Sequence, residues 1–195
     1  MLVLLRHGQT DANARGVLLG RSDVPLTALG RRQAVAAGRA LPRDARIVTS
    51  PLERARETAA LAVPGAQVTV DDRWIEIDYG EYEQMTMSGV SEVDRLAWRS
   101  EVSFRPPGGE SLVDVGRRVR AAIESLMAEA QERDVVVVSH VSPIKAAIAW
   151  ALGVGDEVAW RLHLSVAAIS RIAVGSMVVL ESFNETAHLE AMDRH

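Results

Sequence analysis

The sequence predicts a three-layer α/β/α sandwich with a mainly parallel central sheet. Two continuous apolar runs, at residues 2–5 and 135–138, each end in polar residues, which is typical of strands buried on both faces of a sheet. Segments with helical spacing of apolar residues alternate with these runs along most of the chain. Because no repeat or linker interrupts the 195 residues, we expect a single domain over residues 1–195.

The first half of the chain alternates between strands and helices. After the first strand, Thr27 is placed to cap a helix over residues 28–41, which Pro42 ends. A strand over 47–49 leads into a helix over 50–62 that carries Pro51 in its first turn, and another strand covers 68–70. Residues 79–111 have weak periodicity and six Gly and Pro residues, so we expect a long connection with one helix near 92–99.

The second half holds the strongest helical signal. Apolar residues recur at spacings of three and four from 112 to 130, and Ser111 is placed as the N-cap. The valine run at 135–138 precedes an apolar helix that Pro143 opens and that ends near residue 152. Two late strands, at 167–173 and 177–182, are joined through a short turn with Gly175, which predicts an antiparallel hairpin at or near the sheet edge.

The composition excludes several functional classes. With 22 Lys and Arg against 26 Asp and Glu, the net charge of −4 offers no general surface for nucleic acid or an anionic membrane. The absence of cysteine excludes disulfides, thiolate zinc sites and a cysteine nucleophile. The first apolar run is too short for a signal peptide, and no stretch reaches the roughly 20 apolar residues of a membrane span. We therefore expect a cytoplasmic protein in which any anion site is a local cluster.

Two of the predicted strands deliver a histidine at their carboxyl ends. His7 follows residues 2–5 and His140 follows residues 135–138. Ligands of open parallel sheets bind outside the carboxyl ends of the strands, so the two rings can converge. Arg6 lies beside His7, and Arg54 lies in the first turn of a helix, where the helix N-terminus also attracts anions. These four residues predict a pocket for a dianion.

Several motifs occur in order along nearly the whole chain. The main ones are Leu5-Arg6-His7-Gly8-Gln9-Thr10 with Asn13, Ser50-Pro51-Leu52 with Arg54, and His140 after a valine-rich strand. Supporting motifs are Trp74-Ile75-Glu76, Gly108-Gly109-Glu110-Ser111 and the tail over 183–189. With this set of motifs, the sequence resembles the histidine phosphatase superfamily, in its phosphoglycerate-mutase-like branch. The resemblance implies a phosphoglycerate-mutase-like fold and a cofactor-free phosphatase that hydrolyses small phosphorylated metabolites through a phosphohistidine intermediate.

The resemblance also implies roles for individual residues. His7 would be the nucleophile, while Arg6, Arg54 and His140 would hold the phosphoryl oxygens and Asn13 would add a further contact. These are the groups that phosphoryl transfer needs for positioning and charge stabilisation.

Glu76 matches the family's proton donor to the leaving group. Asp78, Glu81 and Glu83 compete for that role within the same acidic segment. The sequence departs from the family at Val141-Ser142, where many members have Gly-Gly after the second histidine. This difference affects the expected choice of substrate more than the expected reaction.

Several alternatives stay open at this point. A cofactor-dependent phosphoglycerate-type mutase would use the same phosphohistidine, but the known mutases are longer, and their basic insertion has no counterpart between Glu76 and Ser111. A catalytically inactive binding protein on the same fold is the other alternative. No H-E-x-x-H motif or tight His/Asp cluster predicts a metal site. His163 and His188 are expected to be structural or without chemistry, and a homodimer is compatible with the sequence.

Overall fold

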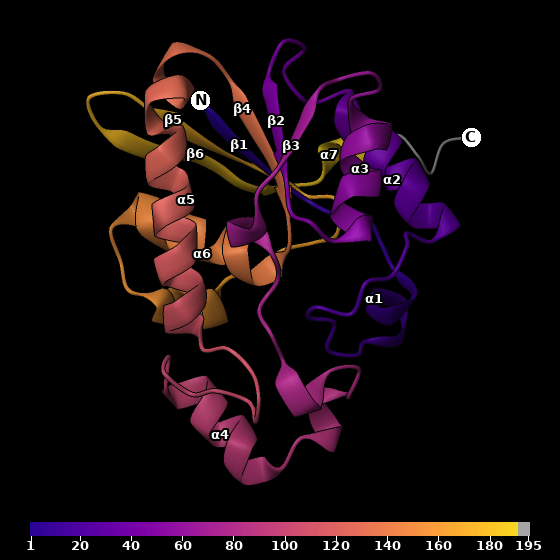
Figure 1. Ribbon diagram of the computed structural model, residues 1–195, viewed down its shortest axis with the longest axis vertical. Coiled ribbons are helices and arrows are strands. Elements are labelled where there is room, and N and C mark those ends of the chain that lie inside the picture. Colours follow the sequence, from indigo (N-terminus) through magenta and orange to yellow (C-terminus); the bar gives the residue numbers. More distant parts are fainter. Residues whose placement is uncertain (191–195) are drawn as a thin grey trace.

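The computed structural model describes residues 1–190, which form a six-stranded sheet with helices on both faces (Figure 1). The strand order is β3-β2-β4-β1-β5-β6. Four strands are parallel, namely β1 (Leu2–Arg6), β2 (Arg46–Thr49), β3 (Val68–Val70) and β4 (Val135–Ser139). β5 (Ile169–Val174) runs antiparallel to β1 and to β6 (Val178–Glu185). The predicted α/β sandwich with a mainly parallel sheet is confirmed.

The register of the central strands determines where the site lies. β1 pairs with β4 from Leu2–Val135 to Arg6–Ser139, so the next residue of each strand is a histidine. The pairing continues past the strand ends, because His7 N donates to Ser139 O over 3.0 Å. Ser50 N likewise donates to Val138 O over 3.0 Å, which brings the end of β2 to the same edge. Three adjacent strands therefore deliver polar residues to one place.

The helices cover the sheet in two layers. α2 (Ala28–Gly38) and α3 (Glu53–Ala62) pack on one face, over a core that includes Val3, Leu5 and Ile47. α5 (Leu112–Glu132) and α6 (Val141–Leu152) pack on the other, over Leu2, Leu4 and further apolar residues. Figure 1 shows these two pairs on opposite sides of the sheet. Within the described residues, no helix combines the length and apolarity needed to cross a membrane.

Two predicted helix boundaries in the first half of the chain are wrong. The helix predicted over 28–41 ends at Gly38, because Ala40 N and Leu41 N donate to carbonyls three residues back and tighten the last turn. The helix predicted over 50–62 begins only at Glu53. Pro51 lies before it rather than in its first turn, since Leu52 is the N-cap with extended backbone.

The second half follows the prediction with smaller shifts. Ser111 caps α5 as expected, and its side chain accepts from Asp114 N. α6 begins at Val141, two residues before Pro143. The hairpin is antiparallel and β6 lies at the edge, but its strands begin later than predicted. Ala167 has a φ of +54°, which is incompatible with an extended strand.

The connection over 79–111 extends from the edge of the sheet where the strands β1 and β4 end. It contains α4 (Glu92–Ser100), close to the predicted helix, and α4 lies apart from the sheet in Figure 1. The sequence did not predict α1 (Asp11–Arg15), α7 (Ala187–Glu190) or the 3₁₀ turns, which are Asp72–Trp74, Gly80–Tyr82, Met87–Gly89 and Asp156–Arg161. Residues 191–195 of the predicted single domain lie outside the described residues, and that domain assignment stays a prediction.

Candidate active site

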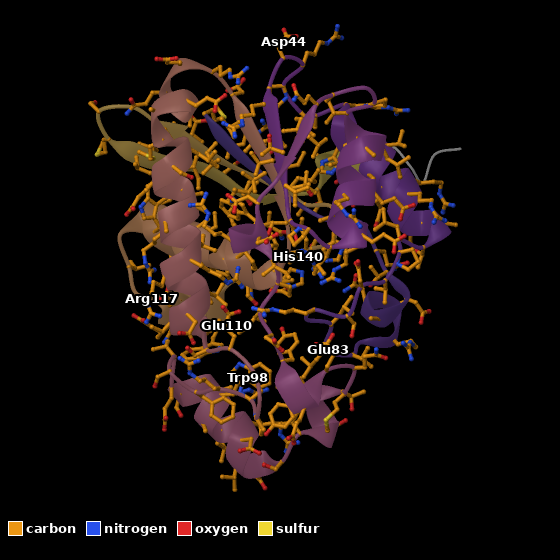
Figure 2. All side chains as sticks on the ribbon, viewed as in Figure 1. Asp44, Glu83, Trp98, Glu110, Arg117 and His140 are labelled. Carbon is orange, nitrogen blue, oxygen red and sulfur yellow. The ribbon has the colours of Figure 1, made fainter. Side chains whose placement is uncertain are left out.

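His7 and His140 lie together at the carboxyl ends of β1 and β4. Their ring centroids are 5.1 Å apart, and both side chains are buried, with exposed fractions of 3% and 0%. Figure 2 shows His140 between the end of the sheet and the segment that carries Trp98. The convergence of two histidines separated by most of the sequence follows directly from the strand register.

The tautomer of His7 follows from its hydrogen bond to the backbone. Its Nδ1 lies 2.7 Å from Gly8 O, and a carbonyl oxygen can only accept, so Nδ1 carries the proton. The lone pair of the neutral ring is therefore on Nε2. Burial, followed by the positive charges of Arg54 and Arg6, holds the pKa of His7 well below 6.5. His7 is thus neutral at neutral pH and presents an unprotonated Nε2.

Gly8 allows the chain to turn tightly after His7. A Cβ at this position would lie 2.3 Å from Gly30 O on α2, so a side chain has no room there. Gly8 N donates to Thr58 Oγ1 of α3 over 3.1 Å. The backbone that carries the His7 ring is therefore attached to two helices of one layer.

Arg54 is the most completely enclosed cation of the site. Its exposed fraction is 0%, and its Nε donates to His140 Nδ1 over 3.2 Å. Its terminal nitrogens donate to Ser22 O over 2.9 Å and to Gly20 O over 2.6 Å. Arg54 thus links α3, the loop after β1 and the second histidine.

Glu83 positions the loop that binds Arg54. One carboxylate oxygen of Glu83 accepts from Gly20 N over 2.9 Å and from Ser22 N over 3.1 Å. A Cβ on Gly20 would lie 2.6 Å from Ile77 O, so this contact also depends on glycine. Sequence analysis proposed Glu83 only as a competing proton donor, and no pattern in the chain indicated that it binds a distant loop. The structure places it against the loop, not beside the histidine pair.

The guanidinium of Arg6 has a hydrogen-bond partner at one nitrogen and none at another. A terminal nitrogen donates to Leu164 O over 2.6 Å, whereas the buried Nε has no hydrogen-bond partner among the described residues. Burial lowers the pKa of Arg6 to about 10, so the group stays cationic at neutral pH. A buried N–H of this kind is what an oxyanion can satisfy.

Glu76 is buried at the N-terminus of α6, next to His140. Its exposed fraction is 3%, and Oε1 accepts from Ile77 N over 2.8 Å and from Ser142 N over 3.1 Å. Oε2 accepts from Val141 N over 3.0 Å. The carboxylate thereby satisfies two of the unpaired N–H groups at the start of the helix.

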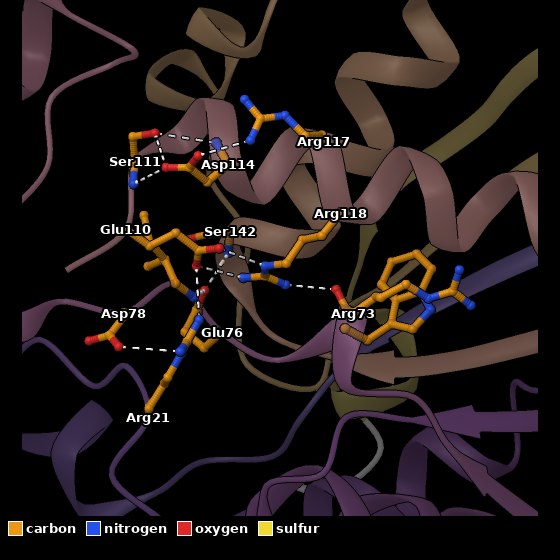
Figure 3. Close-up of polar contacts among 12 residues, drawn as sticks. Arg21, Arg73, Glu76, Asp78, Glu110, Ser111, Asp114, Arg117, Arg118 and Ser142 are labelled. Atoms are coloured by element: carbon orange, nitrogen blue, oxygen red, sulfur yellow. Dashed lines mark hydrogen bonds and ion pairs between the residues drawn. The ribbon is translucent and has the colours of Figure 1, made fainter.

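The other candidate acids lie elsewhere. Asp78 forms an ion pair with Arg21 (Figure 3) and accepts from Gly80 N over 2.9 Å. Glu81 is exposed. Among the acids that the sequence proposed, Glu76 is the one that the fold buries beside the histidine pair.

Asn13 lies half-buried in α1, close behind the loop of His7. Its Oδ1 accepts from Thr10 N over 3.0 Å and from Thr10 Oγ1 over 2.9 Å, which forms a capping box. Oδ1 is thus engaged in the cap, and the phosphate contact expected of Asn13 stays a prediction.

An ion-pair network that the sequence did not predict connects the long segment to α5. Arg118 binds both carboxylate oxygens of Glu110, over 2.9 and 3.0 Å, and donates to Arg73 O over 2.7 Å. Figure 3 shows Arg118 between these two partners, with Arg21 beyond Glu110. The motif match over Gly108-Gly109-Glu110-Ser111 marked Glu110 in the sequence, but it did not predict the ion pair with Arg118.

Residues 1–190 contain no group of three or more His, Cys, Asp or Glu placed to hold a metal ion. His188 binds the backbone through Nε2, 2.9 Å from Ala167 O, and His163 lies near Ser165 outside the histidine pair. The prediction of a cofactor-free site stays a prediction.

The family model described as the histidine phosphatase superfamily (branch 1) matches residues 2–185. The chain belongs to the histidine phosphatase superfamily. A bifunctional protein of Mycobacterium tuberculosis is 41% identical over 177 residues, which are 87% of this chain and 49% of that protein. The chain therefore spans about half the length of this relative.

Two further matches cover most of both proteins compared. The glucosyl-3-phosphoglycerate phosphatase of Mycobacterium tuberculosis is 40% identical over 161 residues, which are 74% of this chain and 72% of that enzyme. The solved structure of a mycobacterial glucosyl-3-phosphoglycerate phosphatase in complex with VO3 superposes with a TM-score of 0.85 at 36% identity. That superposition covers 95% of this chain and 98% of the other.

Proposed function

We propose that this chain is a phosphomonoesterase that hydrolyses small phosphorylated metabolites through a phosphohistidine on His7. The observation that carries the proposal is the bond between His7 Nδ1 and Gly8 O, which leaves Nε2 unprotonated beside His140. An imidazole with its free lone pair among cations is suited to attack a phosphorus atom. The name glucosyl-3-phosphoglycerate phosphatase, carried by both the compared sequence and the compared structure, supports the same reaction class.

In the first step, Nε2 of His7 attacks phosphorus while the ester bond from phosphorus to the alcohol oxygen breaks. Arg6 and Arg54 hold the phosphoryl oxygens, and Asn13 adds a contact through Nδ2. His140 joins them by turning its Nε2–H from Ser50 Oγ to a phosphoryl oxygen. Fixed cations stabilise the charge on these oxygens in the transition state. Glu76, protonated for this step, gives its proton to the departing alcohol oxygen.

In the second step, water attacks the phosphorus of phosphohistidine and the bond from phosphorus to Nε2 breaks. Glu76, now a carboxylate, accepts a proton from the water. His7 regains its neutral form with the proton on Nδ1, and inorganic phosphate leaves. The site thus returns to its starting state without a cofactor.

The test is turnover of p-nitrophenyl phosphate and a panel of phosphorylated metabolites between about pH 4 and pH 9, with His7→Ala as the matched control. We expect wild-type turnover and nearly complete loss in the variant. ¹⁸O from labelled water should enter the released phosphate. Transfer to an added hydroxyl acceptor without release of phosphate would instead indicate a mutase. A folded wild-type protein without turnover would favour a binding protein on this fold.

Finer expectations accompany this proposal. The enzyme would need no metal, would act in the cytoplasm and would have neither nucleic acid nor membrane as a partner. A homodimer is to be tested by light scattering. The acidic net charge of −4 supports the absence of a nucleic-acid surface.

A further inference from the structure

The chain contains a single lysine, Lys145, whereas its other 21 basic residues are arginines. Lys145 lies on α6, one helical turn after Val141 and Ser142, the residues that replace Gly-Gly in the family pattern. Residues three and four apart share a face of a helix, so these three side chains point to one side. That side faces a cavity.

The cavity has a volume of about 130 Å³ and aromatic walls. Tyr79, Trp98 and Trp160 line it together with Val141, Ser142 and Lys145. This volume is close to that of a cavity that binds benzene, ~150 Å³, so it can hold a group of about one ring. The walls offer flat apolar faces to such a group.

The cavity borders the catalytic residues through direct chain neighbours. Ile77, which also lines it, follows Glu76, and Val141 follows His140. Val141 N and Ser142 N are the same groups that hold the Glu76 carboxylate. The cavity and the Glu76 carboxylate are therefore joined through the first turn of α6, although Glu76 itself does not line the cavity.

Lys145 has hydrogen-bonding capacity to spare in this cavity. Its Nζ donates to Ala159 O over 2.9 Å, and an ammonium has three donors. Among the described residues it forms no ion pair, in contrast to Arg21, Arg118 and Arg120. Burial is the main cause that lowers the pKa of Lys145, and the charge of Glu76 opposes this effect. An anion in the cavity would offset more of the cost of burial.

We propose that Lys145 binds a second anionic group on the leaving group of the substrate, so the enzyme prefers phosphomonoesters whose alcohol carries a carboxylate or a phosphate on a ring-sized body. This inference rests on the proposed phosphatase function. The aromatic walls hold the body of the leaving group, and Lys145 pairs with its oxyanion. Val141 and Ser142 contribute to the same wall, which gives the replacement of Gly-Gly a role in substrate choice.

The test compares kcat/KM for phenyl phosphate, 3-carboxyphenyl phosphate and 1,3-phenylene bisphosphate. These esters share one ring and differ in the second group, so the two anionic esters separate carboxylate from phosphate recognition. We expect the wild-type enzyme to have a higher kcat/KM for at least one ester with a second anionic group than for phenyl phosphate. Lys145→Met should reduce this ratio of kcat/KM values by about tenfold or more. Lys145→Arg should keep part of it, because the charge remains.

Arg32→Met is the matched control. It removes the same charge from an exposed position on α2, which packs on the opposite face of the sheet. Its preference among the three esters should equal that of wild type. An equal loss on all three esters in Lys145→Met, with a lower melting temperature, would mean that Lys145 only attaches the Asp156–Arg161 turn to α6 and would overturn the proposal.

A binding measurement separates this inference from the proposed reaction. Because Lys145 is the only lysine, protein grown with ¹³C-lysine gives one side-chain ε-CH₂ signal. We expect that signal to shift on addition of 3-hydroxybenzoate and to stay in place with phenol. A signal that responds to both alike or to neither would overturn the inference. If the wild-type protein turned over none of the phosphomonoesters, the proposed phosphatase function would be overturned instead.

Discussion

Arg54 donates from Nε to Nδ1 of His140 over 3.2 Å, and this contact fixes the tautomer of the second histidine. A guanidinium cannot accept a hydrogen bond, so Nδ1 of His140 carries the lone pair. The proton is then on Nε2, which lies 2.6 Å from Ser50 Oγ. The two histidines are thus neutral with opposite tautomers, His7 with its lone pair on Nε2 and His140 with its lone pair on Nδ1.

Removal of Arg54 should lower activity strongly. Arg54→Ala should reduce kcat/KM for p-nitrophenyl phosphate by about two orders of magnitude or more, because it deletes a buried cation that is proposed to hold the transferring phosphoryl group. Arg54→Lys should rescue poorly, since a lysine offers a point charge in place of a planar fork.

Arg56 provides the control for Arg54. It is exposed on the same helix, two residues away, so Arg56→Ala should resemble wild type in kcat/KM. Losses of similar size in the two variants would contradict the assigned role of Arg54. Thermal unfolding of each variant checks that any loss of activity is not a loss of fold.

The loss of activity on substitution of Glu76 should depend on the leaving group of the substrate. Glu76→Gln should slow hydrolysis of alkyl phosphates by about 100-fold or more and slow p-nitrophenyl phosphate much less, because nitrophenolate departs without protonation. The measurement is the ratio of kcat/KM for the two esters. Glu81→Gln is the control at an exposed position and should leave the ratio unchanged. Equal losses on both esters after Glu76→Gln would remove Glu76 from the role of proton donor.

Both site histidines should stay neutral below the ordinary pKa of imidazole. Burial, and then the positive charge of Arg54, holds the pKa of each well below 6.5. Protonation of His7 would block attack by Nε2, so the nucleophile should remain competent as the pH falls below 6.5. NMR titration of ¹⁵N-histidine-labelled protein tests this, with the two signals identified by their loss in His7→Ala and His140→Ala. A midpoint at or above 6.5 for His7 would be inconsistent with its buried, cation-flanked position.

Chelation should leave activity intact. The described residues offer no metal-ligating cluster, and the proposed steps use only side chains of the chain and water. Activity after dialysis against EDTA should equal that of an untreated sample. A loss that a divalent cation restores would show that the site has been misinterpreted.

The fold could be predicted because its central strands consist almost entirely of apolar residues. The runs at 2–5 and 135–138 are fully buried, and their apolar character alone indicated parallel strands at the middle of a sheet. The ends of elements were predicted less well, because they depend on contacts distant in sequence. α6 begins at Val141 because Glu76 accepts from the first N–H groups of the helix. Gly38, the last residue of α2, lies against Ala62 of α3.

The site could be predicted where a motif is local. Neighbouring motif residues and the ends of predicted strands indicated four site residues, and the structure brings them together. These are Arg6, His7, Arg54 and His140. Glu83 and Glu110 could not be assigned, because their partners, Gly20 and Arg118, are set by tertiary folding alone. The same holds for Lys145, whose cavity is formed by residues from five separate segments.

The covalent intermediate on His7 is the central claim, and rapid quenching tests it most directly. Protein mixed with ³²P-labelled phosphomonoester and quenched in alkali within milliseconds should carry acid-labile label, and peptide mapping should place that label on His7 Nε2. His7→Ala should carry none, while Arg32→Met should label like wild type. Label on a different residue, or turnover in His7→Ala at the wild-type rate, would contradict the mechanism.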